Sequence, residues 1–166
     1  MCVFILAGLV RSATTANSAV SVSMGSFCLV GVTSSSVNLT ISNPATPGGV
    51  PNNATNASTY AQYSSVVASG VTRRITAQWA TGNSAPTGCE LRLQASPAGG
   101  VQGTSAGQIV VSTTAQNIVT GIGGCATGTG ATSGALFSFT LVINTMTSLV
   151  ANEIKTATIT LTLTDS

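Results

Sequence analysis

The chain has 166 residues and a formal net charge of +2, and charged residues make up 5% of it, against about 25% in an ordinary soluble domain. Its 21 Ser and 26 Thr supply a polar surface without charge. So small a charge does not provide the basic face that nucleic-acid binding needs. The chain contains no histidine, which excludes Ser-His-Asp and Cys-His catalysis. Its acids Glu90, Glu153 and Asp165 are widely separated, so we expect no enzyme activity, no metal and no cofactor.

The chain opens with an apolar block, residues 2–10 (CVFILAGLV). Nine residues are too few for a membrane-spanning helix, which needs about 20. The length fits the apolar region of a signal peptide, with residues 16–19 (ANSA) as a candidate cleavage site. The alternative is a strand buried on both faces and donated to a neighbouring subunit. The donated side chains would be Val3, Phe4, Ile5, Leu6, Leu9 and Val10.

The polar segment 11–19 can serve as an extended linker between that block and the rest of the chain. We therefore expect residues 1–18 to be a donor strand with its linker, or the remnant of a signal peptide. Residues 19–166 would form one domain.

Alternation of apolar and polar residues predicts strands in the first half of the chain. Residues 19–32 begin with Val20, Val22 and Met24 on one face, and residues 36–42 alternate again. A loop over 43–58 follows. Ser69-Gly70 is a hairpin signal between two further predicted strands, 60–68 and 71–80.

The second half continues the pattern, with predicted strands at 89–95, 108–112, 135–144 and 154–164. Residues 115–121 fit either a strand or one helical turn, and the glycine-rich stretch 121–134 predicts a loop. Thr, Val and Ile dominate these segments, as is typical of strands. The sequence therefore predicts seven to nine strands in an antiparallel β-sandwich of immunoglobulin-like or jelly-roll-like type.

The four cysteines form no CxxC pair, and disulfides are a better interpretation than a metal site; free buried thiols are the alternative. We expect a Cys89–Cys125 bond, which would fix the glycine-rich loop and contribute about 3–4 kcal/mol by closing a loop of about 35 residues. Cys2 and Cys28 would then pair within one subunit or between two.

Two further features bear on the surface of the protein. Asn38, Asn53 and Asn56 each begin an N-x-S/T sequence and are possible glycosylation sites. Arg73 and Arg74 are adjacent, so at most one of them can join a given face of a strand. For this pair we favour protection of a sheet edge, with contacts between subunits, over binding of an anion or glycan.

Several features together resemble the pilin-like fibre subunits: the apolar terminal strand, the low charge and the Thr-rich alternation of the closing segment 156–164 (TATITLTLT). These families include chaperone–usher pilins, spore-coat-U-like domains and archaeal bundling pili. Residues 103–129 are also similar to segments of exported bacterial proteins of this kind. Chaperone–usher subunits commonly carry one disulfide, however, and four cysteines suggest two.

The resemblance implies an incomplete sandwich that accepts a terminal strand from the next subunit. We therefore expect the structural subunit of a secreted, cell-surface filament, whose partners are copies of itself. The alternative is a secreted monomeric adhesin or a carbohydrate-binding module. Such a module would show an aromatic platform, yet aromatic residues are 4% of the chain.

Overall fold

The computed structural model describes residue 15 and residues 17–166. Cys2 and the predicted donor residues Val3, Phe4, Ile5, Leu6, Leu9 and Val10 lie outside the described residues. The described part of the chain contains ten strands and two short 3-10 helices, at Gly100–Gln102 and Met146–Ser148. The strands are β1 (Phe27–Val32), β2 (Ala54–Val66), β3 (Arg73–Trp79), β4 (Cys89–Ser96), β5 (Thr104–Ser105), β6 (Gln108–Val110), β7 (Gln116–Ile122), β8 (Cys125–Ala126), β9 (Ala135–Ile143) and β10 (Ile159–Asp165).

The strands form two antiparallel sheets that pack face to face. The larger sheet has the order β1-β2-β9-β4-β6, with β8 also paired to β2, and the smaller sheet has the order β10-β3-β7-β5. Side chains from both sheets meet in one core, in which Ile75 and Ile118 of the smaller sheet and Leu93 and Phe137 of the larger sheet are almost fully buried. The predicted all-β antiparallel sandwich is confirmed.

Most segments whose sequences alternate between apolar and polar residues fold as strands in which one face is buried. Buried and half-buried residues alternate along the whole of β3 and along β9 as far as Val142, as expected for strands with one core-facing side. The ambiguous segment 115–121 folds as the strand β7 rather than as a helical turn. Gly134, just before β9, has φ +104°, and a Cβ there would overlap the carbonyl oxygen of Ala61, so only glycine fits.

Several local predictions are wrong. The predicted strand 19–32 is a strand only over Phe27–Val32, and β2 begins at Ala54, inside the predicted loop 43–58. Residues 36–42 form no strand, and only Ser42 makes an isolated bridge, to Asn52. Ser69-Gly70 is a turn, with Gly70 at φ +80°, but it does not close a hairpin. The strands on its two sides, β2 and β3, belong to different sheets, so the turn carries the chain across the sandwich. The last strand begins at Ile159, not Ile154, which is 94% exposed.

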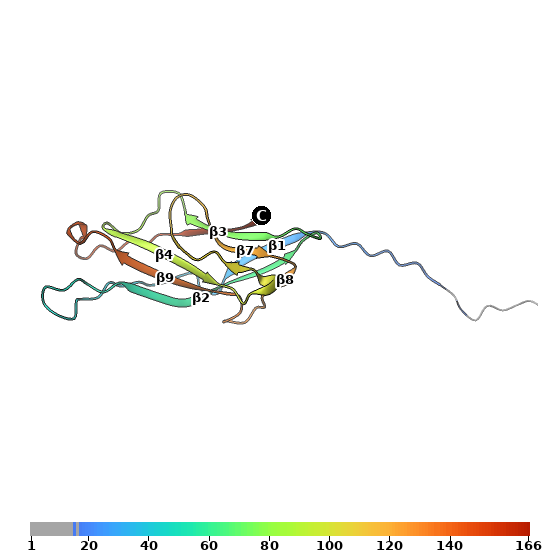
Figure 1. Cartoon of the computed structure of the whole chain (residues 1–166), viewed down its shortest axis with the longest axis horizontal. Coiled ribbons are helices and arrows are strands. Elements are labelled where there is room, and N and C mark those ends of the chain that lie inside the picture. The colour runs from blue at the N-terminus through green and yellow to red at the C-terminus, as the bar shows by residue number, and fades with distance from the viewer. Residues whose placement is uncertain (1–14, 16) are drawn as a thin grey trace, which may run out of the picture.

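The molecule is elongated, and its two ends differ (Figure 1). At one end, residues 17–26 leave the start of β1 as an extended segment that projects away from the sandwich. The opposite end carries the loop before β2 and the loop after β9. We call residues 17–26 the N-terminal extension.

Candidate functional site

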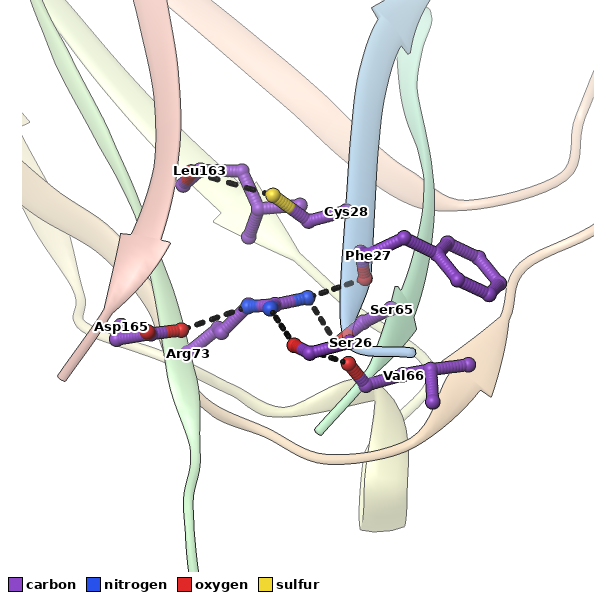
Figure 2. A network of polar contacts seen from close by, with 8 residues as sticks. All are labelled: Ser26, Phe27, Cys28, Ser65, Val66, Arg73, Leu163 and Asp165. Atoms are coloured by element: carbon purple, nitrogen blue, oxygen red, sulfur yellow. Dashed lines mark hydrogen bonds and ion pairs between the residues drawn. The ribbon is translucent and has the colours of Figure 1, made fainter. Parts of the chain in front are cut away.

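The N-terminal extension leaves the sandwich beside a buried arginine. Arg73, at the start of β3, is 5% exposed, and its guanidinium group contacts three other parts of the chain (Figure 2). Its Nε donates to Asp165 Oδ1 at 2.8 Å, and its Nη2 donates to Ser26 Oγ at 2.8 Å. Its Nη1 donates to the carbonyl oxygen of Phe27 and, at 3.3 Å, to Ser65 Oγ.

These contacts explain how a charged side chain is tolerated in the sandwich. A buried charge is costly unless it is paired and its donors are used, and the five-donor fork of arginine can serve several acceptors at once. Asp165 ends β10, Ser65 lies near the end of β2, and Ser26 immediately precedes β1. Arg73 therefore joins three chain segments and fixes the point at which the extension departs.

The extension itself presents apolar side chains to solvent. Val20, Val22 and Met24 are 80%, 84% and 79% exposed. They occupy even-numbered positions, and so do the core-facing residues of β1, of which Val30 lies opposite the buried Tyr63. Because side chains in an extended chain alternate with a period of two, the apolar face of β1 continues beyond the end of its own sandwich. Nothing in the described part of the same subunit covers it.

The side of the sandwich next to this extension is open. Here β1 and β10 are the edge strands of the two sheets, each with one hydrogen-bonded neighbour. The core-facing side chains Val30, Ile159 and Leu161 remain partly exposed, and Val32 is 43% exposed. By contrast, Leu93 and Ile118, deeper in the two sheets, are fully buried. We call this region, between β1 and β10, the open edge.

Half of the backbone N–H and C=O groups of β10 face the open edge and do not pair with β3. The thiol of Cys28, in β1, donates a weak hydrogen bond to the carbonyl oxygen of Leu163 at 3.9 Å, so this carbonyl points away from β3 (Figure 2). At even positions the backbone points toward β3 instead: Thr158 accepts from Ala80, and Ser166 donates to Thr72. The odd residues of β10 therefore present their N–H and C=O groups to the open edge.

The predicted Cys89–Cys125 disulfide is not formed, and both thiols are free, as is that of Cys28. Cys89 begins β4 opposite Ile143, whereas Cys125 lies opposite Ser65 near the far end of β2. At about 3.3 Å per residue, the intervening registers place the two cysteines roughly 40 Å apart. A disulfide requires Cα atoms within about 7 Å, so the prediction fails on geometry. The predicted pairing of Cys28 with Cys2 falls outside the described residues.

The acidic residues are dispersed and engaged in separate contacts. Glu90 accepts hydrogen bonds from Asn144 Nδ2 at 2.8 Å and from Arg92 Nε at 2.6 Å, and these bonds lower the pKa of its carboxyl group. Glu153 accepts from the backbone N–H of Thr87, and Asp165 pairs with Arg73. In the part of the chain that the structure describes, no three Cys, Asp or Glu residues gather as metal ligands would.

The two adjacent arginines face opposite sides of β3, as the alternation of a strand requires, but neither has the role that we expected. Strand β3 lies between β10 and β7, so neither arginine protects a sheet edge, and that prediction is wrong. Arg73 faces inward, and Arg74 is half-buried on the opposite face with its Nε lacking a hydrogen-bond partner. The sequence alone predicts that the two arginines face opposite ways. Only the topology shows that Arg73 anchors the extension.

The three N-x-S/T asparagines lie before or within the first part of β2. Asn38 and Asn53 are exposed, and Asn56 is half-buried. The Oδ1 of Asn53 accepts from the backbone N–H of Ile143 at 3.1 Å. The Oδ1 of Asn56 accepts from Ser58, at an irregularity in the pairing of β2 with β9. The side chains of Asn53 and Asn56 thus stabilise local backbone.

Two hollows lie close to the open edge. One, of about 270 Å³, lies where the extension meets the end of β2 and is lined by Met24, Gly25, Ser26, Val66, Val67 and Ala68. The other, of about 240 Å³, lies beside β1 and is lined by Leu29, Val30, Gly31, Gln62, Tyr63, Ser64, Gly128 and Thr129. Neither is lined by a carboxylate or a basic side chain.

Across the described residues, no helix is both long and apolar enough to cross a membrane. Comparison with known proteins identifies no relative: no family model, no curated protein and no solved structure matches the chain.

Proposed function

We propose that this protein is a non-enzymatic structural subunit that polymerises with copies of itself by β-strand donation, as the repeating unit of an extracellular filament. The observation that carries the proposal is the N-terminal extension. Its Val20, Val22 and Met24 continue the apolar face of β1 past the end of the sandwich and are about four-fifths exposed. A strand with an uncovered apolar face is suited to complete the sheet of another subunit.

The donor assignment differs from the sequence prediction in its position. The sequence placed the donor at residues 2–10, with 11–19 as its linker, whereas the exposed apolar alternation of the described chain lies at 20–24. The two are compatible if a longer donor segment includes both. The apolar block 2–10 is then the distal part of that segment.

The energetics favour such a longer donor. Burying Val20, Val22 and Met24 would contribute about 1.5–3 kcal/mol each, as an upper limit. Association costs about 4–15 kcal/mol, so these three side chains alone would support only weak assembly. Residues 3–10 carry six more large apolar side chains, whose burial would add on the order of 10 kcal/mol by the same measure.

Composition and edge structure support assembly over solubility as a monomer. With 5% charged residues, the surface carries few of the charges that oppose association. Natural sheets protect their edges with charged or proline residues or with bulges. β10 has none of these before its final Asp165, because it reads ITLTLTD and pairs with β3 without a register shift.

A monomeric carbohydrate-binding or adhesive module is less well supported. Such modules stack sugars on exposed aromatic rings, but Trp79 and Tyr63 are 7% and 3% exposed. The Tyr63 hydroxyl is also occupied, since it donates to the carbonyl oxygen of Gln102 at 2.6 Å. In the described part of the chain the most exposed aromatic ring is that of Phe27, at 50%, and one ring makes no platform.

The experiment compares the wild-type chain with Val22→Asp by sedimentation and negative-stain electron microscopy over a range of concentrations. The wild type should form filaments, and Val22→Asp should stay monomeric because its carboxylate would have to be buried. Its thermal unfolding midpoint should match that of the dissociated wild type, since Val22 is 84% exposed.

The matched control is Ser21→Asp, which places the same charge one residue away on the opposite face of the extension. It should assemble as the wild type does. A wild-type chain that stays monomeric at every concentration would overturn the proposal. Filaments of Val22→Asp, or loss of filaments in both variants alike, would show that the apolar face of the extension is not what joins the subunits.

A further inference from the structure

We propose that the acceptor is the free edge of β10, and that the extension of the next copy adds to it as an antiparallel fifth strand of the smaller sheet, in a head-to-tail stack. This inference rests on the proposed function and specifies its interface. The occupant is a second copy of this chain, through residues 17–26.

Strand length and regularity single out β10 and β1 among the edges. The edge strands on the opposite side of the sandwich are β6, with three residues, and β5, with two. Neither offers a ladder long enough to specify a register. β10 has seven residues and β1 has six, and both lie along the open edge.

The side chains of β10 match those of the extension. Its core-facing Ile159 and Leu161 are partly exposed, and its outward-facing Thr160, Thr162 and Thr164 are exposed. The extension alternates in the same way, with apolar Val20, Val22 and Met24 separated by Ser21 and Ser23. Added beside β10, its apolar side chains would cover Ile159, Leu161 and Val30, while its serines would lie beside the threonines on the outer face.

Chain direction favours β10 over β1 as the hydrogen-bonding partner. Arg73 joins Asp165, the end of β10, to Ser26, the base of the extension (Figure 2). β10 therefore runs toward the base of the extension, while the extension, read from its N-terminus, runs back toward that base from outside. In a neighbour of the same orientation, the extension lies antiparallel to β10 and parallel to β1. All pairings in the described sandwich are antiparallel.

The native cysteines provide a direct test, because the added strand would cover Cys28, which is exposed at the open edge. Alkylation of Cys28 by iodoacetamide, followed by mass spectrometry, should be slower by about tenfold or more in wild-type filaments than in Val22→Asp monomers. The control is the same alkylation after unfolding in urea, in which Cys28 should react equally fast in both preparations.

Amide hydrogen exchange tests the hydrogen bonds themselves. The N–H groups of Leu161 and Leu163, which face the open edge, should exchange about tenfold or more slowly in filaments than in Val22→Asp monomers. Those of Gln108 and Val110, on the edge strand β6, should not change. The antiparallel direction of the added strand is tested in filaments assembled from a mixture of differently labelled chains. Intermolecular contacts in these filaments should place Val20 of one chain closer to Leu163 of the next chain than Met24 is.

The outcomes separate this inference from the proposed function. If filaments form and depend on Val22, but Cys28, Leu161 and Leu163 are as accessible as in the monomer, strand donation stands and the β10 acceptor is wrong. Intermolecular contacts in the reverse order would overturn the antiparallel arrangement. A wild-type monomer in which Leu161 and Leu163 are already protected would show that the extension closes its own edge, and would overturn both proposals.

Discussion

Arg73 and Arg74 show how much the environment of a single residue decides. They are chemically identical neighbours on β3, yet Arg73 uses its donors on four groups of the chain, and the Nε of Arg74 is buried without a partner. The inward position makes Arg73 a structural anchor. The outward position leaves Arg74 with an unpaired donor, which costs stability.

We predict that Arg73→Met destabilises the fold by about 2–3 kcal/mol, because it removes the buried guanidinium group and leaves Ser65 and the Phe27 carbonyl without their donor. Urea unfolding of both variants in the non-assembling Val22→Asp background measures this. Arg74→Met is the matched control and should not destabilise the fold, because it removes a buried donor that has no partner. Equal losses in the two variants would contradict the anchoring role of Arg73.

The ionisation of Tyr63 makes the stability of the fold depend on pH in the alkaline range. Burial, and secondarily the charge of Cys125, raises the pKa of its phenol from 10 to about 12. The folded state therefore holds this proton when the unfolded state has lost it. Its contribution to stability is complete below pH 10 and declines between pH 10 and 12, by up to about 1.4 kcal/mol per pH unit.

We predict that Tyr63→Phe is less stable than its parent by about 1 kcal/mol at pH 8, because it lacks the hydrogen bond to Gln102. This difference should shrink as the pH rises above 10, because the variant has no phenol to ionise. Urea unfolding from pH 8 to 11.5, again in the Val22→Asp background, tests it. A difference that stays constant across this range would show that the proton on Tyr63 does not contribute.

Among the elements, β10 lies at the boundary between the closed core and the open edge. Leu163 is buried, at 8% exposed, near the strand end that Arg73 fixes. Leu161, two residues earlier on the same face, is only partly buried. The strand therefore contributes one fully buried residue to the monomer core and leaves the preceding positions only partly covered.

We predict that Leu163→Ala costs the monomer about 2–3 kcal/mol and that Leu161→Ala costs about 1 kcal/mol, because the cost of truncation scales with burial. The measurement is urea unfolding of Val22→Asp chains that carry each change. In wild-type filaments, Leu161→Ala should also raise the concentration needed for assembly. A larger cost for Leu161 than for Leu163 in the monomer would mean that the edge is closed without a neighbour.

At the scale of the whole molecule, the positions of Cys89 and Cys125 exclude the disulfide that the sequence predicted. Burial raises the pKa of both thiols that were expected to pair, with the charge of Glu153 adding to the effect at Cys89. A higher pKa lowers the reactive thiolate fraction. The thiol of Cys28 is exposed at the open edge, where a reagent can reach it.

We predict that non-reducing peptide mapping of the native protein recovers Cys89 and Cys125 in separate alkylated peptides. In native Val22→Asp monomers, Cys28 should react with iodoacetamide faster than either of them, by about tenfold. Recovery of one peptide that joins Cys89 to Cys125 would contradict the sheet registers that separate them.

The sequence by itself determined the fold class and the inward face of most strands, because a period of two in hydrophobicity and an excess of Thr, Val and Ile reflect strands with one buried side. It also identified Val20, Val22 and Met24 as one apolar face. It did not determine that the turn at Ser69-Gly70 crosses between sheets, because the same turn chemistry serves a hairpin or a crossing. Nor did it determine where the cysteines lie, because strands adjacent in space are distant in sequence. Tertiary structure alone decided that β1 and β10 border an open edge, that Arg73 ties both to the base of the extension, and that residues 17–26 have no core of their own to cover them. Each of these depends on which strands pair, and pairing is set by packing over the whole sandwich rather than by any local pattern.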